Sequence, residues 1–211
     1  MEGVVETRMI EQIQSRISQR SFNLFGFAPL MRAAVMIPLV EKDGKLHVLF
    51  EVRARTLKRQ PGEICFPGGK IEDGDVSEQD AAVRETCEEL GLVREDIQVI
   101  ETLGILIPPY SSSIYSFIGK IHDYRKISPN KNEVEEIFYV PLDFFLEKEP
   151  DVHYIHLAVK PEENFPFELI PQGKNYKWRS SRLPEFFYQY DGRIIWGLTA
   201  RILYEFITIV K

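Results

Sequence analysis

Three glutamates follow Arg84 closely in the chain, at positions Glu85, Glu88 and Glu89. On a helix the first and last of these are four residues apart and the middle one is three after the first, so all reach one side. Like charges at these spacings repel by about 0.2–0.5 kcal/mol per pair. Clustered carboxylate oxygens are ligands that Mg²⁺ and Mn²⁺ prefer, and such ions often bridge to substrate phosphates. We therefore interpret the cluster as a metal site, with a solvated acidic helix face as the alternative.

The residues around this cluster favour the metal site. Asp73 and Asp75 add two carboxylates just before the expected helix, and Gly91 stands where a glycine ends a helix. The turn Phe66-Pro67-Gly68-Gly69 leads into this region, and its glycines allow a ligand to approach the backbone closely. We expect Gly68 and Gly69 to lie at a substrate-binding site.

A basic segment precedes this turn. Arg53, Arg55, Lys58 and Arg59 place four positive charges within seven residues of a chain whose net charge is −6. An acidic protein needs such local positive charge, or a bound cation, to hold an anionic ligand. We expect these four residues to bind substrate, and the alternative is an exposed loop that charge keeps soluble.

Composition excludes several other classes of protein. The chain has 211 residues, of which 44% are hydrophobic and 27% charged, as in ordinary globular domains. The acidic balance argues against a nucleic-acid or membrane-surface binder. The two cysteines, Cys65 and Cys87, form neither a disulfide framework nor a zinc pattern. With no signal-peptide pattern and no membrane-span pattern, we expect a cytoplasmic protein.

Hydrophobic periodicity predicts the elements that position these residues. Residues 7–20 have apolar side chains at helical spacing, so we expect residues 1–30 to form a helical extension packed on a domain of residues 31–211. Residues 77–90 are predicted to form the helix of the glutamate cluster, with Ser77 as its cap. Strands are predicted at 33–40, 46–52, 64–66, 97–107, 113–121, 136–140, 153–159, 186–190 and 193–195, with a helical turn at 141–146 and a closing helix at 197–209. The fold class is therefore α/β, with one mixed sheet and flanking helices in a single domain.

The segment from Gly69 to Leu92 resembles the Nudix box, G-x5-E-x7-R-E-U-x-E-E-x-G-U, in which U is apolar. Its second half matches from Arg84 to Leu92, apart from Thr86 at an apolar position, whereas in the first half Asp75 stands where glutamate is usual. Eight residues rather than seven separate Asp75 from Arg84.

This resemblance implies an α/β/α sandwich, Mg²⁺ or Mn²⁺ as cofactor, and hydrolysis of a nucleoside diphosphate derivative. It implies Glu85 and Glu89 as the main metal ligands. It also implies that Glu88 takes part in both metal binding and catalysis, and that Arg84 contributes to catalysis by orienting the glutamates through charge-assisted hydrogen bonds.

The segment from Leu49 to Gly69 is similar to the motif of the coenzyme A pyrophosphatase branch, L-L-T-x-R-[SA]-x3-R-x3-G-x3-F-P-G-G. Arg53, Ala54, Gly62 and residues 66–69 match it in register, Lys58 replaces arginine, and Phe50-Glu51 replaces Leu-Thr. The implied reaction is attack of activated water on the pyrophosphate of coenzyme A or its derivatives, giving 3′,5′-ADP and (acyl-)4′-phosphopantetheine.

Two later segments are also similar to this branch. Residues 132–142 resemble its E-V-x-x-x-[FY]-x-x-P-L stretch, which makes Glu133 the candidate catalytic base, with Glu135 and Glu136 as rivals. Residues 195–200 resemble its W-G-x-T-A helix, in which we interpret Trp196 as a packing residue.

Two alternative functions remain at this stage. The chain is expected to bind a small-molecule nucleotide of the coenzyme A type, but ADP-ribose, a dinucleotide or an altered nucleoside triphosphate is the alternative substrate. A module that binds nucleotide without catalysis is the alternative from another class, although such a module has no need for three repelling glutamates. The oligomeric state is left open, with a homodimer as one outcome.

Overall fold

The computed structural model describes residues 11, 14–16, 18, 31–109 and 112–211. The chain divides into two units, Met1–Leu30 and Met31–Lys211, and the second unit carries every candidate site residue. The predicted helical extension of residues 1–30, and its packing on the domain, fall almost entirely outside the described residues and stay predictions.

A mixed seven-stranded sheet forms the centre of the second unit. Its main path runs β3-β2-β1-β6-β5, β4 pairs with β1, and β7 pairs with β2. The β1–β6 pair is parallel, and the other pairs are antiparallel. The strands are β1 (Met31–Lys42), β2 (Lys45–Arg53), β3 (Ile64–Cys65), β4 (Gly68–Lys70), β5 (Ile97–Leu106), β6 (Ser112–Ile121) and β7 (Val134–Pro141).

The hairpin between β1 and β2 has the predicted turn. Lys42 pairs with Lys45, and Asp43 and Gly44 between them have positive φ angles of 53° and 73°. Two residues with positive φ match the right-handed twist of the flanking strands, which is why Asp-Gly is favoured there. The turn therefore fixes the register of β2 against β1.

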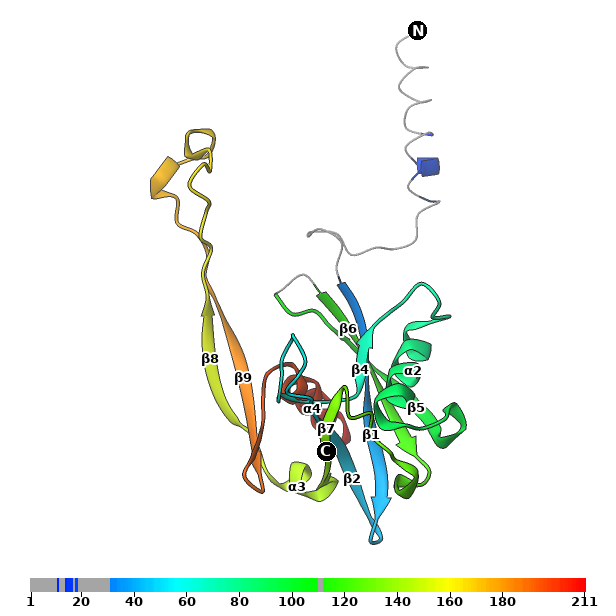
Figure 1. Cartoon of the computed structure of the whole chain (residues 1–211). Helices are drawn as coiled ribbons and strands as arrows, with labels where there is room; N and C mark the ends of the chain where they lie inside the picture. Colours follow the sequence, from blue (N-terminus) through cyan, green and yellow to red (C-terminus); the bar gives the residue numbers. More distant parts are fainter. Residues whose placement is uncertain (1–10, 12–13, 17, 19–30, 110–111) are drawn as a thin grey trace. The chain divides into compact units, whose positions relative to one another are not determined.

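Two helices cover opposite faces of this sheet, α2 (Glu78–Leu90) and α4 (Gly197–Val210) (Figure 1). Leu49 belongs to the core cluster that contains the buried residues of α2, whereas its neighbour Phe50 belongs to the cluster that contains those of α4. Adjacent strand residues face opposite sides of a sheet, so β2 contributes to both clusters. The predicted α/β/α arrangement is confirmed.

Both ends of α2 follow the sequence. The Ser77 hydroxyl accepts a hydrogen bond of 3.1 Å from the Asp80 amide at the first turn. Gly91 ends the helix with a φ of 64°, and a Cβ atom there would lie 2.2 Å from the carbonyl oxygen of Ser128. Only glycine fits this position, because both the left-handed backbone and the close contact exclude a side chain.

The C-terminal strands depart from the single sheet expected. β8 (Asp151–Leu157), β9 (Ser181–Tyr190) and β10 (Arg193–Ile195) form a separate sheet in the order β10-β9-β8. β9 begins five residues before the predicted strand, and β8 and β9 run together as a long ribbon (Figure 1). Between β7 and β8 lies the short helix α3 (Leu142–Glu147), close to the predicted helical turn. Within the part of the chain that the structure describes, no helix is long and apolar enough to cross a membrane.

Candidate active site

Helix α2 presents Glu85 and Glu89 to the glycines that begin β4. Glu89 is buried, Glu85 is partly buried and Glu88 is exposed. One oxygen of the Glu89 carboxylate, Oε2, accepts a hydrogen bond of 2.8 Å from the backbone amide of Gly68. The structure thus brings Glu89 and the predicted glycine turn together.

Arg84 holds the carboxylates on its side of the helix. Its Nε and Nη2 atoms donate to the two oxygens of Asp75 at 2.8 and 3.0 Å, and Nη1 donates to Glu85 at 2.9 Å and to Glu88 at 3.3 Å. The hydrogen bonds from Arg84 lower the pKa of Asp75 to about 2. Asp75 therefore anchors the guanidinium group, although its spacing departs from the Nudix pattern.

Gly68 and Gly69 leave room for different neighbours. A Cβ atom on Gly69 would lie 2.5 Å from an oxygen of the Glu85 carboxylate. A Cβ atom on Gly68, where φ is 155°, would lie 2.4 Å from the carbonyl oxygen of Ala34. Because Gly69 has no side chain, the carboxylate of Glu85 fits beside it. Because Gly68 has none, β4 can pair closely with β1.

Glu51 lies in the interior of β2 beside these groups, and sequence reasoning did not select it. It is completely buried. The Cys65 thiol donates to its Oε1 at 3.2 Å, and its Oε2 has no hydrogen-bond partner. A signal was present, since Glu51 interrupts an apolar strand and replaces the usual threonine of the motif. Its complete burial could not be predicted from sequence, because the alternation of apolar and polar residues along a strand does not show how deeply a side chain is buried.

The electrostatics of the cluster disfavour negative charge in the absence of a cation. Burial raises the pKa of Glu51, Glu85 and Glu89 above the usual range for glutamate. The charge of Glu51 raises the pKa of Glu89 further, and the charge of Glu133 raises those of Glu51 and Glu85. The negative charge of each carboxylate thus raises the pKa of its neighbours, and a bound divalent cation would lower these pKa values instead.

The donor set fits a hard divalent cation. Carboxylate oxygens are the preferred ligands of Mg²⁺ and Mn²⁺, and the partnerless Oε2 of buried Glu51 lies beside the helix carboxylates. Among the described residues, no three Asp, Glu, His or Cys side chains already form a metal-binding group. Arg84 donates hydrogen bonds to Glu85 and Glu88 instead, and the Gly68 amide donates one to Glu89.

The charge of Glu133 acts on Glu51 and Glu85 of the cluster, whereas its two rivals lie beside arginines. The Ala54 amide donates to the carbonyl of Glu133 at 2.8 Å, which fixes that backbone at the end of β2. The side chain of Glu135 lies 4.0 Å from Arg55, and that of Glu136 lies 3.4 Å from Arg193. The choice of Glu133 among the three candidate bases stays a prediction.

Of the four basic residues, Arg53 lies deepest. Its Nε is buried and has no hydrogen-bond partner, and the residue lines a cavity next to Gly68. Arg55, Lys58 and Arg59 are exposed and are not among the residues that line this cavity. The structure thus separates Arg53 from the rest of the basic segment.

This cavity has a volume of about 510 Å³ and lies on the α4 side of the sheet. None of the clustered glutamates lines it, but two of its lining residues, Cys65 and Gly68, donate hydrogen bonds to Glu51 and Glu89, and its wall is mainly apolar. Trp196 forms part of that wall, stacks on Phe187 with ring centroids 6.1 Å apart, and is 47% exposed. Trp196 therefore packs on Phe187, as we interpreted it, and also lines the cavity.

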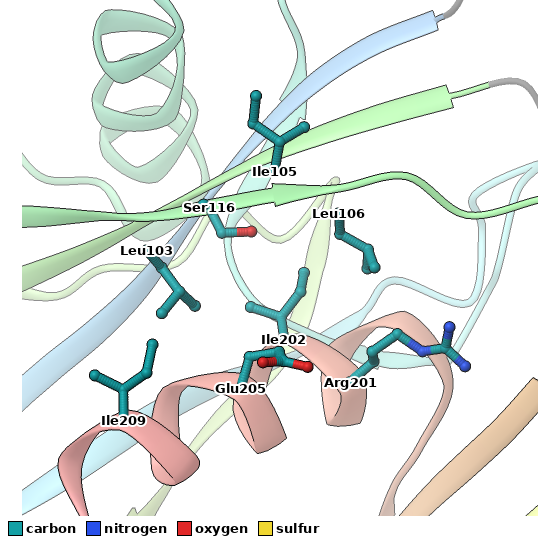
Figure 2. A pocket seen from close by; sticks show the side chains of 9 residues that line it. Leu103, Ile105, Leu106, Ser116, Arg201, Ile202, Glu205 and Ile209 are labelled. Carbon is teal, nitrogen blue, oxygen red and sulfur yellow. The ribbon is translucent and has the colours of Figure 1, made fainter.

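A second cavity, of about 250 Å³, lies between β5, β6 and α4. Figure 2 shows Leu103 and Leu106 pointing towards the helix that carries Ile202, with the hydroxyl of Ser116 between the strands and the helix. That hydroxyl is buried and has no hydrogen-bond partner. No α2 glutamate lines either cavity, but Gly68, whose amide donates a hydrogen bond to Glu89, lines the first one, so that cavity is the candidate active site.

Comparisons with known proteins identify the family of the chain. Residues 30–161 match the model of the NUDIX domain. The chain is 37% identical over 142 residues to the peroxisomal coenzyme A diphosphatase NUDT7 of Mus musculus, covering 67% of this chain and 56% of that protein. It is 30% identical over 173 residues to the mitochondrial coenzyme A diphosphatase NUDT8 of Homo sapiens, covering 81% of this chain and 65% of that protein. The chain spans about half the length of the curated relatives it matches.

Among solved structures, a MutT/nudix family protein from Enterococcus faecalis superimposes with a TM-score of 0.50 at 16% identity. The match covers 95% of this chain and 69% of that chain, and it shows the likeness of the fold alone.

Proposed function

Because the chain belongs to the Nudix family, we propose that it hydrolyses the pyrophosphate of coenzyme A or its derivatives, giving 3′,5′-ADP and (acyl-)4′-phosphopantetheine. The observation that carries this proposal is the mainly apolar cavity that adjoins the glutamate cluster at Arg53 and Gly68. A pyrophosphate placed beside the glutamates would leave a long, weakly polar arm such as pantetheine in that cavity. The two named relatives are called coenzyme A diphosphatases, which supports this substrate.

Glu85, Glu89 and Glu88 would hold Mg²⁺ or Mn²⁺ through their carboxylate oxygens. The bound ion would neutralise charge on the pyrophosphate and lower the pKa of the attacking water. Arg84, anchored by Asp75, keeps the carboxylates of Glu85 and Glu88 on one side of α2. We assign it a positioning role.

Glu133 would accept the proton of the attacking water. It lies beside the cluster, and Asn130 Nδ2 donates to its Oε2 at 3.2 Å, which orients the carboxylate. Arg53 has an unpaired, buried Nε and lines the cavity, so it would donate to a phosphate oxygen of the substrate. Arg55, Lys58 and Arg59 would act from the exposed rim by attracting the anionic substrate.

A panel of nucleotides tests the proposal. The protein is incubated with Mg²⁺ or Mn²⁺ and coenzyme A, acyl-coenzyme A, ADP-ribose or a dinucleoside polyphosphate, and the products are identified by mass. We expect 3′,5′-ADP from the coenzyme A substrates and no product in the presence of a chelator. Preferential cleavage of ADP-ribose would refute the substrate, and absence of turnover with every nucleotide would favour a binding module.

Our predictions of the cellular location and of the oligomeric state come from the sequence alone. We keep the cytoplasm as our prediction, while the relatives named above are called peroxisomal and mitochondrial. A homodimer likewise stays a prediction, which light scattering of the purified chain would test.

A further inference from the structure

The side chain of Glu51 faces helix α2 from within the sheet. Residues two apart on a strand share a face. Leu49, two residues earlier, packs in the core cluster that contains Ala81 and Ala82 of α2, so Glu51 points to the same side. Its neighbour Phe50 faces the other side, where it stacks on Phe66 and Phe138. Glu51 thus lies opposite the helix that carries Glu85 and Glu89.

Hydrogen bonding leaves this carboxylate incompletely satisfied. Its Oε1 accepts a hydrogen bond only from the Cys65 thiol, which is a weak donor, and its Oε2 has no partner. The residue is completely buried, so water does not compensate for the missing partner. A buried polar group of this kind is rare in native proteins and calls for an explanation such as an ion.

Neighbouring charges point to a cation rather than to an internal ion pair. The charged groups whose fields act on Glu51 are Arg53, Glu85 and Glu133, and Glu51 in turn acts on Glu89. Arg53 is the one positive group among them, yet its Nε has no partner and the Oε2 of Glu51 receives no hydrogen bond from it. The carboxylates of strand and helix therefore share a site that lacks a matching positive charge.

We propose that Glu51 provides an oxygen ligand from the sheet for the divalent cation that Glu85 and Glu89 hold from the helix. The ion would then lie between β2 and α2 rather than on the helix alone. This inference deepens the metal site of the proposed function and rests on it. The motif of the coenzyme A pyrophosphatase branch has threonine at this position, so a charged ligand distinguishes this chain from that motif. We expect tighter binding of the cation as a result.

Titration of the full-length chain with Mn²⁺, without nucleotide, tests this ligand. Electron paramagnetic resonance measures free Mn²⁺ for the wild type, Glu51→Gln and Glu51→Thr. The first variant keeps the size of the side chain, and the second introduces the residue of the motif. We expect the affinity for Mn²⁺ to fall about tenfold or more in both, since losing even an outer-shell partner costs 10–100-fold. Glu89→Gln provides a reference for ligand loss, and Glu41→Gln, at an exposed glutamate of β1, provides a control without effect.

Thermal unfolding provides a second readout. Addition of Mn²⁺ should stabilise the wild type more than the Glu51→Gln variant. Wild-type Mn²⁺ affinity in either Glu51 variant would overturn the inference. Because no nucleotide is present, failure of coenzyme A cleavage would refute the proposed substrate and leave this result intact.

Discussion

Phe50 and Glu51 are adjacent in β2 and both completely buried, but they lie in very different surroundings. Phe50 stacks on Phe66 and Phe138 with ring centroids 5.0 and 5.4 Å apart, on the α4 side of the sheet. Glu51 faces α2 with one carboxylate oxygen unpaired. The α4 side is thus stabilised by packing, whereas the α2 side tolerates unfavourable charge where a ligand can offset it.

The size of the packing residues differs in the same way. The α2 side contains small residues where the helix meets the sheet, among them Ala34, Ala81 and Ala82, all completely buried, beside larger ones such as Leu49 and Phe117. Small side chains let the helix approach the sheet closely, which brings its glutamates to the β3–β4 turn. The α4 side contains large aromatic rings such as Phe145 and Tyr188, 5.2 Å apart. One side of the sheet therefore positions charged groups and the other provides stability, and the following variants test this contrast.

Replacement of Glu89 by glutamine should have the largest effect on activity. We expect a loss of pyrophosphate hydrolysis on the order of a thousandfold, because an ion that contributes several kcal/mol to the transition state would be lost. Unfolding in urea should show equal or higher stability, since a buried charge is removed. Wild-type turnover in this variant would refute the metal site on α2.

Phe50→Ala should lower stability and leave metal binding unchanged, the opposite of what we expect for Glu89→Gln. We expect the free energy of unfolding to fall by about 3–5 kcal/mol, because the change leaves a cavity among stacked rings. Urea denaturation measures this, and Phe50→Leu is a milder control. The affinity of the folded variant for Mn²⁺ should stay close to that of the wild type. A large loss of affinity would show that the two sides of the sheet do not act separately.

The adjacent glycines allow a matched pair of substitutions. Gly69→Ala places a Cβ atom against the flexible end of Glu85, so we expect weaker Mn²⁺ binding, by about tenfold, with little loss of stability. Gly68→Ala places a Cβ atom against the backbone of β1, so we expect a lower unfolding temperature. Calorimetry and Mn²⁺ titration of both variants distinguish these outcomes, and equal effects would contradict the assigned geometry.

Asp75→Asn should have the smallest effect, seen in the dependence of stability on pH. Arg84 lowers the pKa of Asp75 from 3.8 to about 2 in the folded protein. The carboxylate therefore stabilises the fold fully above its unfolded-state pKa, and this contribution disappears as the pH falls through about 2. The wild type should unfold at a higher temperature than the variant at pH 7. A difference that persists unchanged below both pKa values would contradict the ion pair.

Local features of the site were predictable from sequence. The spacing of Glu85 and Glu89, the cap at Ser77 and the end of the helix at Gly91 depend on neighbours within a few residues, and the structure has all of them. The Asp43-Gly44 turn fixed the first hairpin for the same reason. The Nudix family was also apparent from the sequence, because its motif is contained in one short segment.

Features that depend on distant pairing were not predictable. The separate sheet of β8, β9 and β10, and the cavity between it and the central sheet, arise from contacts between segments far apart in the chain. The sequence indicated four basic residues before the glycine turn, but only the fold distinguished the partly buried Arg53, with its buried Nε, from its exposed neighbours.

The sequence by itself determined a glutamate helix behind a glycine turn, because helix periodicity and turn chemistry act over one or two turns of chain. Only the tertiary structure decided that Glu51 belongs with that helix. At this residue β2 lies between β3 and β7, where Glu51 is paired with Cys65 and Ile137, and its side chain faces the side of the sheet that α2 covers. Burial and charge proximity are properties of the assembled sheet, since they depend on which strands and helices exclude water from a given side chain.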